Sequence, residues 1–462
     1  MGLQDINPAM HINPMKRDWF IRCILDPQIY ALEPHDFIPR KMELIPYSRL
    51  FKGFFLVLNI AFVLSCSSIK WKSTAPDDQQ MMADITYLAS DKLEGRTFGS
   101  EGEKKASDYI SKRFNQLGLK PKGENGTWFQ SLSVKDPSPH NVTFATEGET
   151  GSLTGRNVIG YMDNGAAFTL IIGGHYDHLG MGSFGSLYDG KPAIHNGEDD
   201  NASGTSMVLE LAERLKGNKD FNYLFIAFSG EENGLWGSNY FTDHPTIDLE
   251  SVSAMINFDM VGRLNQEKKL VVNGVGTSPR WPDIIKEANK FGFDIVMSES
   301  GIGPSDHTSF YLMDIPVLHF FTGAHEDYHK PSDDVDKINS AGMIPIADLV
   351  MAVIAQIGGK ETLAFTKTKD PDPSTTPKME VTLGVLPDYL YDGVGLRLEG
   401  VREEKPAQIA GLKKGDIIIR MGGKDIKDIY AYMEVLGTFH KGDKTKVTAI
   451  RDGNEMEFEI SF

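Results

Sequence analysis

Three apolar runs in the middle of this chain each lead directly into acidic or imidazole side chains. Residues 168–172 precede His175, residues 223–228 precede a pair of glutamates, and residues 252–258 precede Asp259. Runs of this length, rich in Ile, Leu, Val and Phe, predict buried strands. The chain must therefore fold so that several strands end at polar turns.

After Asp200 the apolar pattern changes its period. Behind the turn at residues 201–204, five apolar residues recur at helical spacing. They are Met207, Val208, Leu211, Ala212 and Leu215. Strand, polar turn and helix in this order predict an α/β sheet with helices on both faces. Ligands in such sheets bind at the carboxyl ends of the strands, where these polar residues would lie.

Five separate segments offer carboxylates or imidazoles beside glycines and other turn residues. They are residues 173–178, 198–204, 229–233, 257–260 and 328–332. Neutral imidazole with carboxylate oxygen suits zinc, and no thiol competes for the ion. Two such ions, about 3.5–4 Å apart and bridged by one carboxylate, would activate a water and stabilise the oxyanion formed at a carbonyl. Together the segments predict a metallohydrolase.

Each segment also has an ordinary structural interpretation. His175 can be a hydrogen-bonded loop residue, Asp200 can belong to a helix-capping turn, and His329 can lie in a plain loop. The adjacent glutamates can be acids in the first turn of a helix, favoured by its dipole. Asp259 is harder to explain in this way, because a carboxylate ending an apolar strand is costly to bury unless it is paired or metal-bound.

The order of the segments resembles the di-zinc aminopeptidase family, which includes bacterial leucyl aminopeptidases and, more distantly, glutamate carboxypeptidase. The resemblance runs from about Met81, through residues 93–96 (Leu-Glu-Gly-Arg) and 99–102 (Gly-Ser-Glu-Gly), to a helix ending near Ile357. It implies a peptidase domain over residues 77–360, with a three-layer α/β/α sandwich and a mixed, mostly parallel sheet.

The resemblance implies a ligand set, position by position. His175 and Asp259 would bind one zinc, Glu232 and His329 would bind the other, and Asp200 would bridge them. The expected cofactor is therefore Zn²⁺, two per chain.

Three further side chains take roles by the same resemblance. Glu231 falls on the general base, which accepts a proton from the attacking water and passes it to the departing amine. Asp177 corresponds to the carboxylate that orients the ring of His175. Tyr328 corresponds to a residue that polarises the scissile carbonyl oxygen.

Other polar residues near these segments are not assigned as ligands. His178 and His325 are two of them. Residues 305–307 (Ser-Asp-His) would contact substrate, brace the ligands or form a hydrogen-bonding turn.

Composition narrows the class of protein. The 462 residues suggest two domains with extensions, and a formal net charge of −17 argues against nucleic acid as a partner. The two cysteines, Cys23 and Cys66, both precede the catalytic segments, so neither a disulfide framework nor thiol catalysis is expected.

The N-terminal region resembles a bacterial lipoprotein signal. An apolar run over residues 54–64 follows Arg49 and Lys52 and ends at Cys66, which would carry the lipid and attach the protein to a membrane. Residues 42–66 would then be the signal and residues 1–41 an over-extended N-terminus. A plain secretory signal and an uncleaved anchor are the alternatives. All predict a secreted or cell-envelope protein, periplasmic or outer-membrane in a bacterium.

Past residue 360 the composition changes. Residues 366–377 are proline-rich and polar, which is typical of a linker, and the linker is expected over residues 361–378. Residues 379–462 resemble a bacterial PDZ domain, most specifically over residues 406–416. Leu383, Gly384 and Val385 would match the loop that binds a peptide's terminal carboxylate, and residues 429–436 the helix beside the groove. Alternatively, the domain only packs against the peptidase.

These observations predict a zinc exopeptidase acting on peptides, with aminopeptidase action as the leading form. Carboxypeptidase or dipeptidase action remains open. Glutaminyl cyclisation, which uses the same fold with a single zinc, is a further alternative. A peptide-binding protein that has lost catalysis is the alternative outside enzymes.

Overall fold

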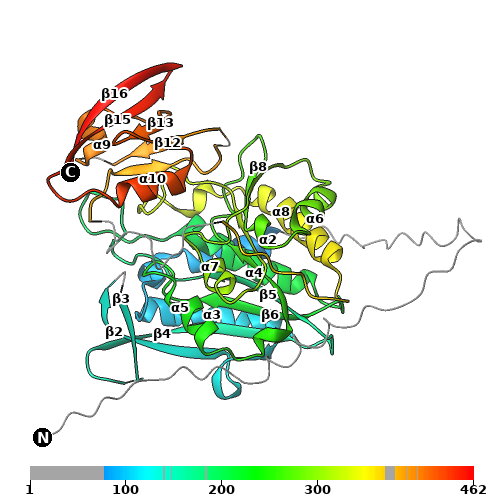
Figure 1. Cartoon of the computed structure of the whole chain (residues 1–462). Coiled ribbons are helices and arrows are strands. Elements are labelled where there is room, and N and C mark those ends of the chain that lie inside the picture. The colour runs from blue at the N-terminus through cyan, green and yellow to red at the C-terminus, as the bar shows by residue number, and fades with distance from the viewer. Residues whose placement is uncertain are drawn as a thin grey trace, which may run out of the picture. The chain divides into compact units, whose positions relative to one another are not determined.

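The computed structural model of the chain describes residues 78–138, 141–146, 148–182, 185–369, 380–391, 393–402 and 404–462. Figure 1 shows the elements of these residues. The predicted over-extended N-terminus (1–41) and lipoprotein signal (42–66), including Cys66, lie outside the described residues. So do residues 370–378 of the predicted linker.

A ten-stranded sheet is the centre of the first domain, with strand order β3-β2-β4-β6-β5-β7-β10-β8-β9 and β1 paired with β4. The four central strands, β6, β5, β7 and β10, run parallel. They pair antiparallel with β4 on one side and with β8 on the other, and β9 pairs in parallel with β8. The strands are β1 (Lys120–Pro121), β2 (Phe129–Ser138), β3 (Asn141–Ala145), β4 (Ser152–Met162), β5 (Thr169–His175), β6 (Asn222–Phe228), β7 (Val252–Phe258), β8 (Lys269–Asn273), β9 (Asp294–Ser298) and β10 (Val317–Phe321).

Helices pack on both faces of this sheet, so the predicted three-layer α/β/α sandwich is confirmed. One face carries α2 (Asp78–Leu88), α3 (Glu101–Gln116), α4 (Gly204–Arg214), α6 (Trp281–Ala288) and α8 (Ser340–Ile357). The other carries α5 (Trp236–Asp243) and α7 (His307–Tyr311).

Strand β5 shows why the central strands are apolar throughout. Leu170 and Ile172 belong to the core beneath α4 and α8, whereas Ile171 belongs to the core beneath α5 and α7. Successive side chains alternate between two buried faces, as in parallel sheets covered by helices. Gly174 brings β5 close to β7, because a Cβ there would lie 2.7 Å from the main-chain oxygen of Phe258.

Helix α8 is long and apolar enough to cross a membrane by length and composition, the one such helix in the part of the chain that the structure describes. It has 18 residues and a mean hydropathy of 1.7. Val350, Val353 and Ile354 are nevertheless buried in the core with α4. It is therefore a core helix of the sandwich.

The C-terminal domain has its own sheet and its own core. The strand order is β11-β12-β13-β15-β16, with β14 paired with β13. Its elements are β11 (Val385–Pro387), β12 (Leu396–Val401), α9 (Pro406–Ala410), β13 (Ile417–Met421), β14 (Lys424–Asp425), α10 (Ile429–Leu436), β15 (Lys444–Arg451) and β16 (Asn454–Ser461). Helix α10 coincides with the predicted groove helix, and Asp428 caps it by accepting the N–H of Ala431.

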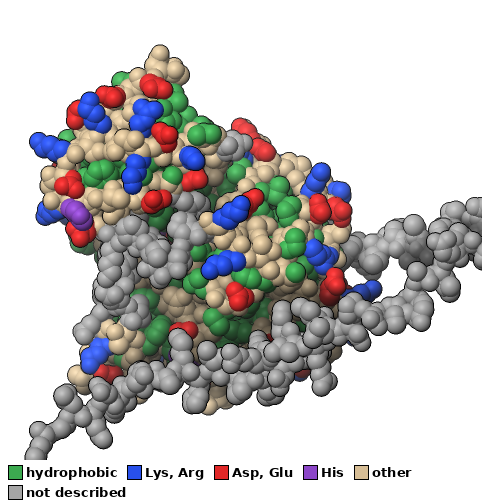
Figure 2. Space-filling view, in the orientation of Figure 1, with side chains coloured by type: hydrophobic (Ala, Val, Ile, Leu, Met, Phe, Trp, Pro, Cys, Tyr) green, Lys and Arg blue, Asp and Glu red, His purple; other side chains and the backbone are tan. Residues whose placement is uncertain are grey.

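Acidic and basic side chains are interspersed on the face of the molecule in Figure 2, rather than gathered by sign.

Candidate metal centre

Strand topology brings the predicted side chains to one edge of the sheet. His175 is the last residue of β5, Asp259 follows β7, and Glu231 and Glu232 follow β6 after a two-residue turn. Because β6, β5 and β7 are parallel neighbours, their carboxyl ends lie side by side. This is where sheets of this class bind ligands.

The loop before α4 supplies Asp200, and hydrogen bonds to a distant aspartate hold this loop in place. Its first residue, Gly197, has φ of 56°, and a Cβ there would lie 2.1 Å from the main-chain oxygen of Asp200. The main-chain N–H groups of Asp199 and Asp200 donate to Asp333 Oδ2 over 3.0 and 3.1 Å. Asp333 in turn pairs with Arg263 at 2.6 Å. The loop's position is therefore set by its main chain, which leaves the side chain of Asp200 available.

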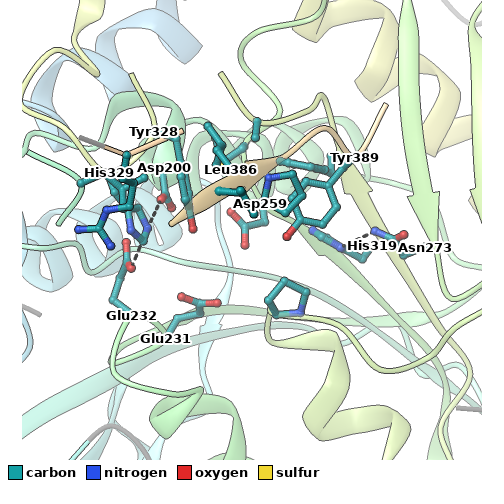
Figure 3. A pocket seen from close by; sticks show the side chains of 18 of the residues that line it. Asp200, Glu231, Glu232, Asp259, Asn273, His319, Tyr328, His329, Leu386 and Tyr389 are labelled. Carbon is teal, nitrogen blue, oxygen red and sulfur yellow. Dashed lines mark hydrogen bonds and ion pairs between the residues drawn. The ribbon is translucent and has the colours of Figure 1, made fainter. Parts of the chain in front are cut away.

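The five predicted ligands form two groups that share Asp200. Nε2 of His175 lies 3.3 Å from Asp200 Oδ1 and 3.4 Å from Asp259 Oδ1. Nε2 of His329 lies 3.1 Å from Asp200 Oδ2 and 3.2 Å from Glu232 Oε2. Figure 3 shows Asp200, Glu232 and His329 together on one side of the pocket.

These distances fit bound zinc. Atoms bound at about 2.0–2.1 Å in a tetrahedral arrangement lie about 3.3 Å from one another. Nδ1 of His329 donates to the main-chain oxygen of Gly185 over 2.8 Å, so the lone pair on Nε2 faces the carboxylates. Nε2 of His175 is buried without a hydrogen-bond partner. The residues present therefore fit a metal site with imidazole and carboxylate ligands.

Electrostatics indicate an excess of negative charge. Burial alone would lower the pKa of His175, but the charges of Glu231 and Asp259 outweigh it, and the pKa lies well above its usual range. His329 behaves likewise, with burial opposed by the charge of Glu232 and by hydrogen bonds to Asp200 and Glu232. A site that attracts protons this strongly also attracts cations.

Glu231 lies beside the two groups rather than within them. Its Oε2 is 3.9 Å from Nε2 of His175, farther than any assigned ligand, and its main-chain N–H donates to Asp177 Oδ1 over 3.2 Å. Burial, and after it the charges of Asp259 and Glu232, raise the pKa of Glu231 well above its usual range, although His175 opposes the shift. The carboxylate is thus held next to the ligands without being one of them.

The Asp177 carboxylate does not hold the His175 ring as directly as its sequence position suggests. Its Oδ1 is 3.7 Å from Nδ1 of His175, while the main-chain oxygen of Asp177 is nearer, at 3.3 Å. The carboxylate accepts the N–H of Glu231 instead. Asp177 therefore links the loop after β5 to the loop after β6.

Tyr328 lines the pocket and stacks on the His329 ring, with centroids 3.8 Å apart. Burial, and then the charges of Asp200 and Glu232, raise the pKa of Tyr328 well above its usual range. Tyr328 thus places a hydroxyl group beside a predicted ligand in the lining of the pocket.

His178 lies closer to the centre than sequence reasoning anticipated. Its Nδ1 is 2.5 Å from Glu232 Oε1 and 4.0 Å from Asp200 Oδ2. His178, Asp200 and Glu232 thus form a second possible ligand group. Its position three residues after His175 was the available signal. His325 is farther out, with Nε2 3.2 Å from Asp199 Oδ2.

The 305–307 turn lies behind the ligands. Asp306 and His307 are fully buried, and neither lines the pocket. Ser305 accepts a hydrogen bond from Asn257 over 2.8 Å. Burial raises the pKa of Asp306 to about 7. This turn is placed to brace the strand end that carries Asp259.

The sequence assigned no role to Arg96, but the structure shows that its side chain connects two loops of the site. The buried guanidinium donates to the main-chain oxygens of Leu88, Tyr176, Asn196 and Gly197. Burial lowers the pKa of Arg96 to about 10, so it stays charged. Arg96 therefore joins the loop after His175 to the loop that carries Asp200.

The predicted carboxylate-binding loop is only partly accessible. Leu383 is buried in the core of the C-terminal domain. Gly384 has φ of 78°, and its N–H donates to Thr382 Oγ1 over 3.1 Å. Gly384 and Val385 line the same pocket as Asp200.

Family comparisons agree with this architecture. Residues 157–354 match the model of Peptidase family M28, and residues 374–462 match that of the PDZ domain. Aminopeptidase YwaD of Bacillus subtilis is 35% identical over 185 residues, covering 38% of this chain and 40% of the relative. The alkaline phosphatase isozyme conversion protein of Escherichia coli is 28% identical, covering 48% and 61%. A probable leucine aminopeptidase of Trichophyton verrucosum is 26% identical, covering 44% and 57%. The chain thus spans about half the length of these relatives.

Two solved structures are also similar to this chain, at lower identity. BSAP, a zinc aminopeptidase from Bacillus subtilis, is 20% identical with a TM-score of 0.48, covering 62% of this chain and 96% of that one. A glutaminyl cyclase from Bacteroides thetaiotaomicron is 16% identical with a TM-score of 0.49, covering 62% and 98%.

Proposed function

We propose that this chain, which carries a peptidase family M28 domain followed by a PDZ domain, is a zinc-dependent exopeptidase that removes N-terminal residues from peptides. The observation that carries the proposal is the pair of imidazole–carboxylate groups that share Asp200, with Glu231 beside them. His175 and Asp259 would hold one ion, and Glu232 and His329 the other. Bound zinc lowers the pKa of water and polarises a carbonyl group.

Glu231 handles the proton in this proposal. It accepts a proton from the attacking water, whose oxygen bonds to the carbonyl carbon. The carbon–nitrogen bond then breaks, and Glu231 passes the proton to the departing amine. Asp177 holds the main chain of Glu231 in place for both transfers. The Tyr328 hydroxyl, in the lining of the same pocket, donates to the carbonyl oxygen as negative charge develops there.

The aminopeptidase form is supported by the relatives, two of which are named as aminopeptidases. Carboxypeptidase or dipeptidase action would use the same water attack with a different end of the peptide bound. Cyclisation of glutaminyl peptides would need one zinc, and a binding protein would cleave nothing.

A substrate screen tests these alternatives. The purified chain, with and without added zinc, is incubated with aminoacyl anilides, free peptides and N-blocked peptides, and metal is counted per chain. The proposal expects release of N-terminal residues, dependence on zinc, two ions per chain and no cleavage of N-blocked substrates. One ion per chain with cyclised products would favour the cyclase, and zinc-loaded protein without any turnover would favour the binding protein.

We also propose that the protein is secreted or in the cell envelope, attached through a lipid at Cys66. The basic flank, apolar run and cysteine of residues 49–66 motivate this. Expression in a bacterial host followed by membrane fractionation checks it, with Cys66→Ser as the control. Equal distribution of the two forms between membrane and soluble fractions would contradict the anchor.

A further inference from the structure

The pocket that contains the ligands has walls from both domains. It is a cavity of about 250 Å³ that includes Asp200, Glu231, Glu232 and Asp259. Seven residues of the C-terminal domain line it as well. They are Thr382, Gly384, Val385, Leu386, Pro387, Tyr389 and Arg402. Figure 3 shows Leu386 on the side of the pocket away from Glu231 and Glu232. A substrate bound at the ligands therefore contacts the segment of the C-terminal domain that contains these seven residues, which begins at Thr382 and ends at Arg402.

Contacts at both ends attach the segment to the pocket rim. The Tyr389 ring packs edge-on against Phe321 with centroids 5.5 Å apart. At the other end, Nη2 of Arg402 donates to the main-chain oxygen of Ser186 over 2.9 Å. Leu187, the next residue, donates its N–H to the main-chain oxygen of His329. Arg402 is thereby fixed close to the loop that carries a predicted ligand.

Strand β11 within this segment has a free edge. It pairs with β12 on one side and ends the sheet, so that none of the described strands pairs with its other side. A free edge of this kind can pair with an extended peptide. The three residues of β11, Val385, Leu386 and Pro387, also line the pocket.

Arg402 supplies a charge that the rest of the pocket lacks. It is the one Lys or Arg among the described residues that line the cavity, which otherwise contains four carboxylates. The guanidinium forms no ion pair with any described residue, and its buried Nε has no hydrogen-bond partner. A guanidinium left without an acid is suited to a carboxylate, which it can bind through two donors.

A second cavity adjoins the cavity that contains the predicted ligands. It has a volume of about 480 Å³, and Arg402, Leu187 and Leu386 line both cavities. Arg402 therefore lies at the boundary between the cavity that contains the ligands and the second cavity. The first cavity is small for a ligand site, so it suits a peptide of a few residues.

We propose that Arg402 is a substrate-binding residue of the peptidase site, and that its guanidinium receives the free C-terminal carboxylate of a di- or tripeptide whose scissile bond lies at the metal ligands. The site then binds both ends of one short substrate. This rests on the proposed function, because it assumes that the same pocket hydrolyses peptides.

The test compares matched substrates in the full-length, zinc-loaded protein. Each di- or tripeptide is supplied as the free acid and as the C-terminal amide, and kcat/KM is measured for both. We expect the free acid to be preferred by roughly 10- to 100-fold, the range of a hydrogen bond to a charged group. Arg402→Gln should reduce this ratio to near one, and Arg402→Lys should restore part of it. Arg420→Gln, an exposed residue of β13, is the matched control and should keep the wild-type ratio.

A binding measurement separates this inference from the proposed function. Calorimetric titration of Glu231→Gln with the same free acids and amides reports recognition without turnover. Tighter binding of the free acid, lost in the double variant with Arg402→Gln, supports the inference even if no hydrolysis is found. Equal binding and equal cleavage of acids and amides would overturn the inference while leaving the peptidase proposal intact. Preference for peptides longer than three residues would also overturn it.

Discussion

The ring of His329 donates its Nδ1 proton to the main-chain oxygen of Gly185 over 2.8 Å. This bond fixes the tautomer of the ring and leaves the Nε2 lone pair facing Asp200 and Glu232. The orientation of a predicted ligand is thus determined by a loop 144 residues earlier in the chain.

Replacing the shared carboxylate should remove the metal. Asp200→Asn keeps the shape of the side chain but removes the charge that would offset the two cations of the proposed site, so we expect lower zinc occupancy and no measurable turnover. Metal analysis and steady-state kinetics on one preparation check this. Two bound ions with full activity in the variant would refute the assignment of Asp200.

Replacing the proton acceptor should separate metal binding from catalysis. Glu231→Gln should keep both ions and lower kcat by at least roughly 10²–10⁴-fold, because an amide cannot accept the proton. Loss of zinc would instead make Glu231 a ligand. Retained zinc with nearly normal kcat would remove it from the mechanism.

Arg96 should matter for stability and for metal affinity together. Arg96→Met leaves four buried main-chain oxygens without their donor, which should lower the free energy of unfolding by roughly 3 kcal/mol or more. Zinc affinity should fall too, because Gly197 and Tyr176 belong to the ligand loops. Denaturant unfolding of chelated protein and zinc titration measure the two effects. Arg420→Met is the exposed control, and wild-type values for both quantities in Arg96→Met would contradict the role.

Glu103 should make stability depend on pH. Burial raises the pKa of Glu103 from 4.5 to about 7, although the hydroxyls of Tyr176 and Ser229 and the N–H of Arg156 donate to it. The folded state therefore favours the protonated form. Its contribution is fully present below about pH 4.5 and is lost as pH rises through about 7, a change of about 3 kcal/mol.

Glu103→Gln should remove this dependence. The free energy of unfolding of the chelated protein, measured at pH 5.5 and 8.5, should fall more in the wild type than in the variant. Glu149→Gln, at an exposed position, should behave as the wild type does. Identical pH slopes in wild type and Glu103→Gln would contradict the shift.

Ending the chain at Lys369 should leave a folded peptidase. The shortened chain keeps Phe365, whose ring packs against Tyr311, and Thr368, whose hydroxyl forms a hydrogen bond with that of Tyr311. A single cooperative thermal transition with hydrolysis of small anilides is expected. The preference for free carboxylates should disappear with Arg402. An unfolded truncated protein would show that the peptidase domain needs the C-terminal domain in order to fold.

Sequence patterns predicted the parts of the molecule that depend on local periodicity. Residues 252–258 coincide with β7, because a continuous apolar run directly reflects burial on both faces of a strand. Residues 429–436, which the resemblance to a PDZ domain implied as a helix, coincide with α10. The five candidate ligands lie together because strand ends meet at one edge, which follows from the predicted sheet.

Relationships across long stretches of chain could not be read from the sequence. Asp333 reaches the N–H of Asp200 over 133 residues, and Arg402 reaches Ser186 over 216. No local pattern encodes such pairs. Composition also predicted a linker from residue 361, yet Thr366 donates its N–H to Thr277 and thus lies on the peptidase domain. Polar, proline-rich composition reports low hydrophobicity rather than absence of contacts.

The buried Arg96 has a consequence for how the metal centre forms. Together with Asp333, it holds the ligand loops through bonds between protein groups, which do not need an ion. In small zinc domains the ion supplies the free energy that orders its own ligands. Here hydrogen bonds between protein groups already order the ligand loops, so we expect the apoprotein to keep its ligands close to their metal-binding positions. Chelation should empty the centre without unfolding the sandwich, and zinc should return to a cavity that already has its shape.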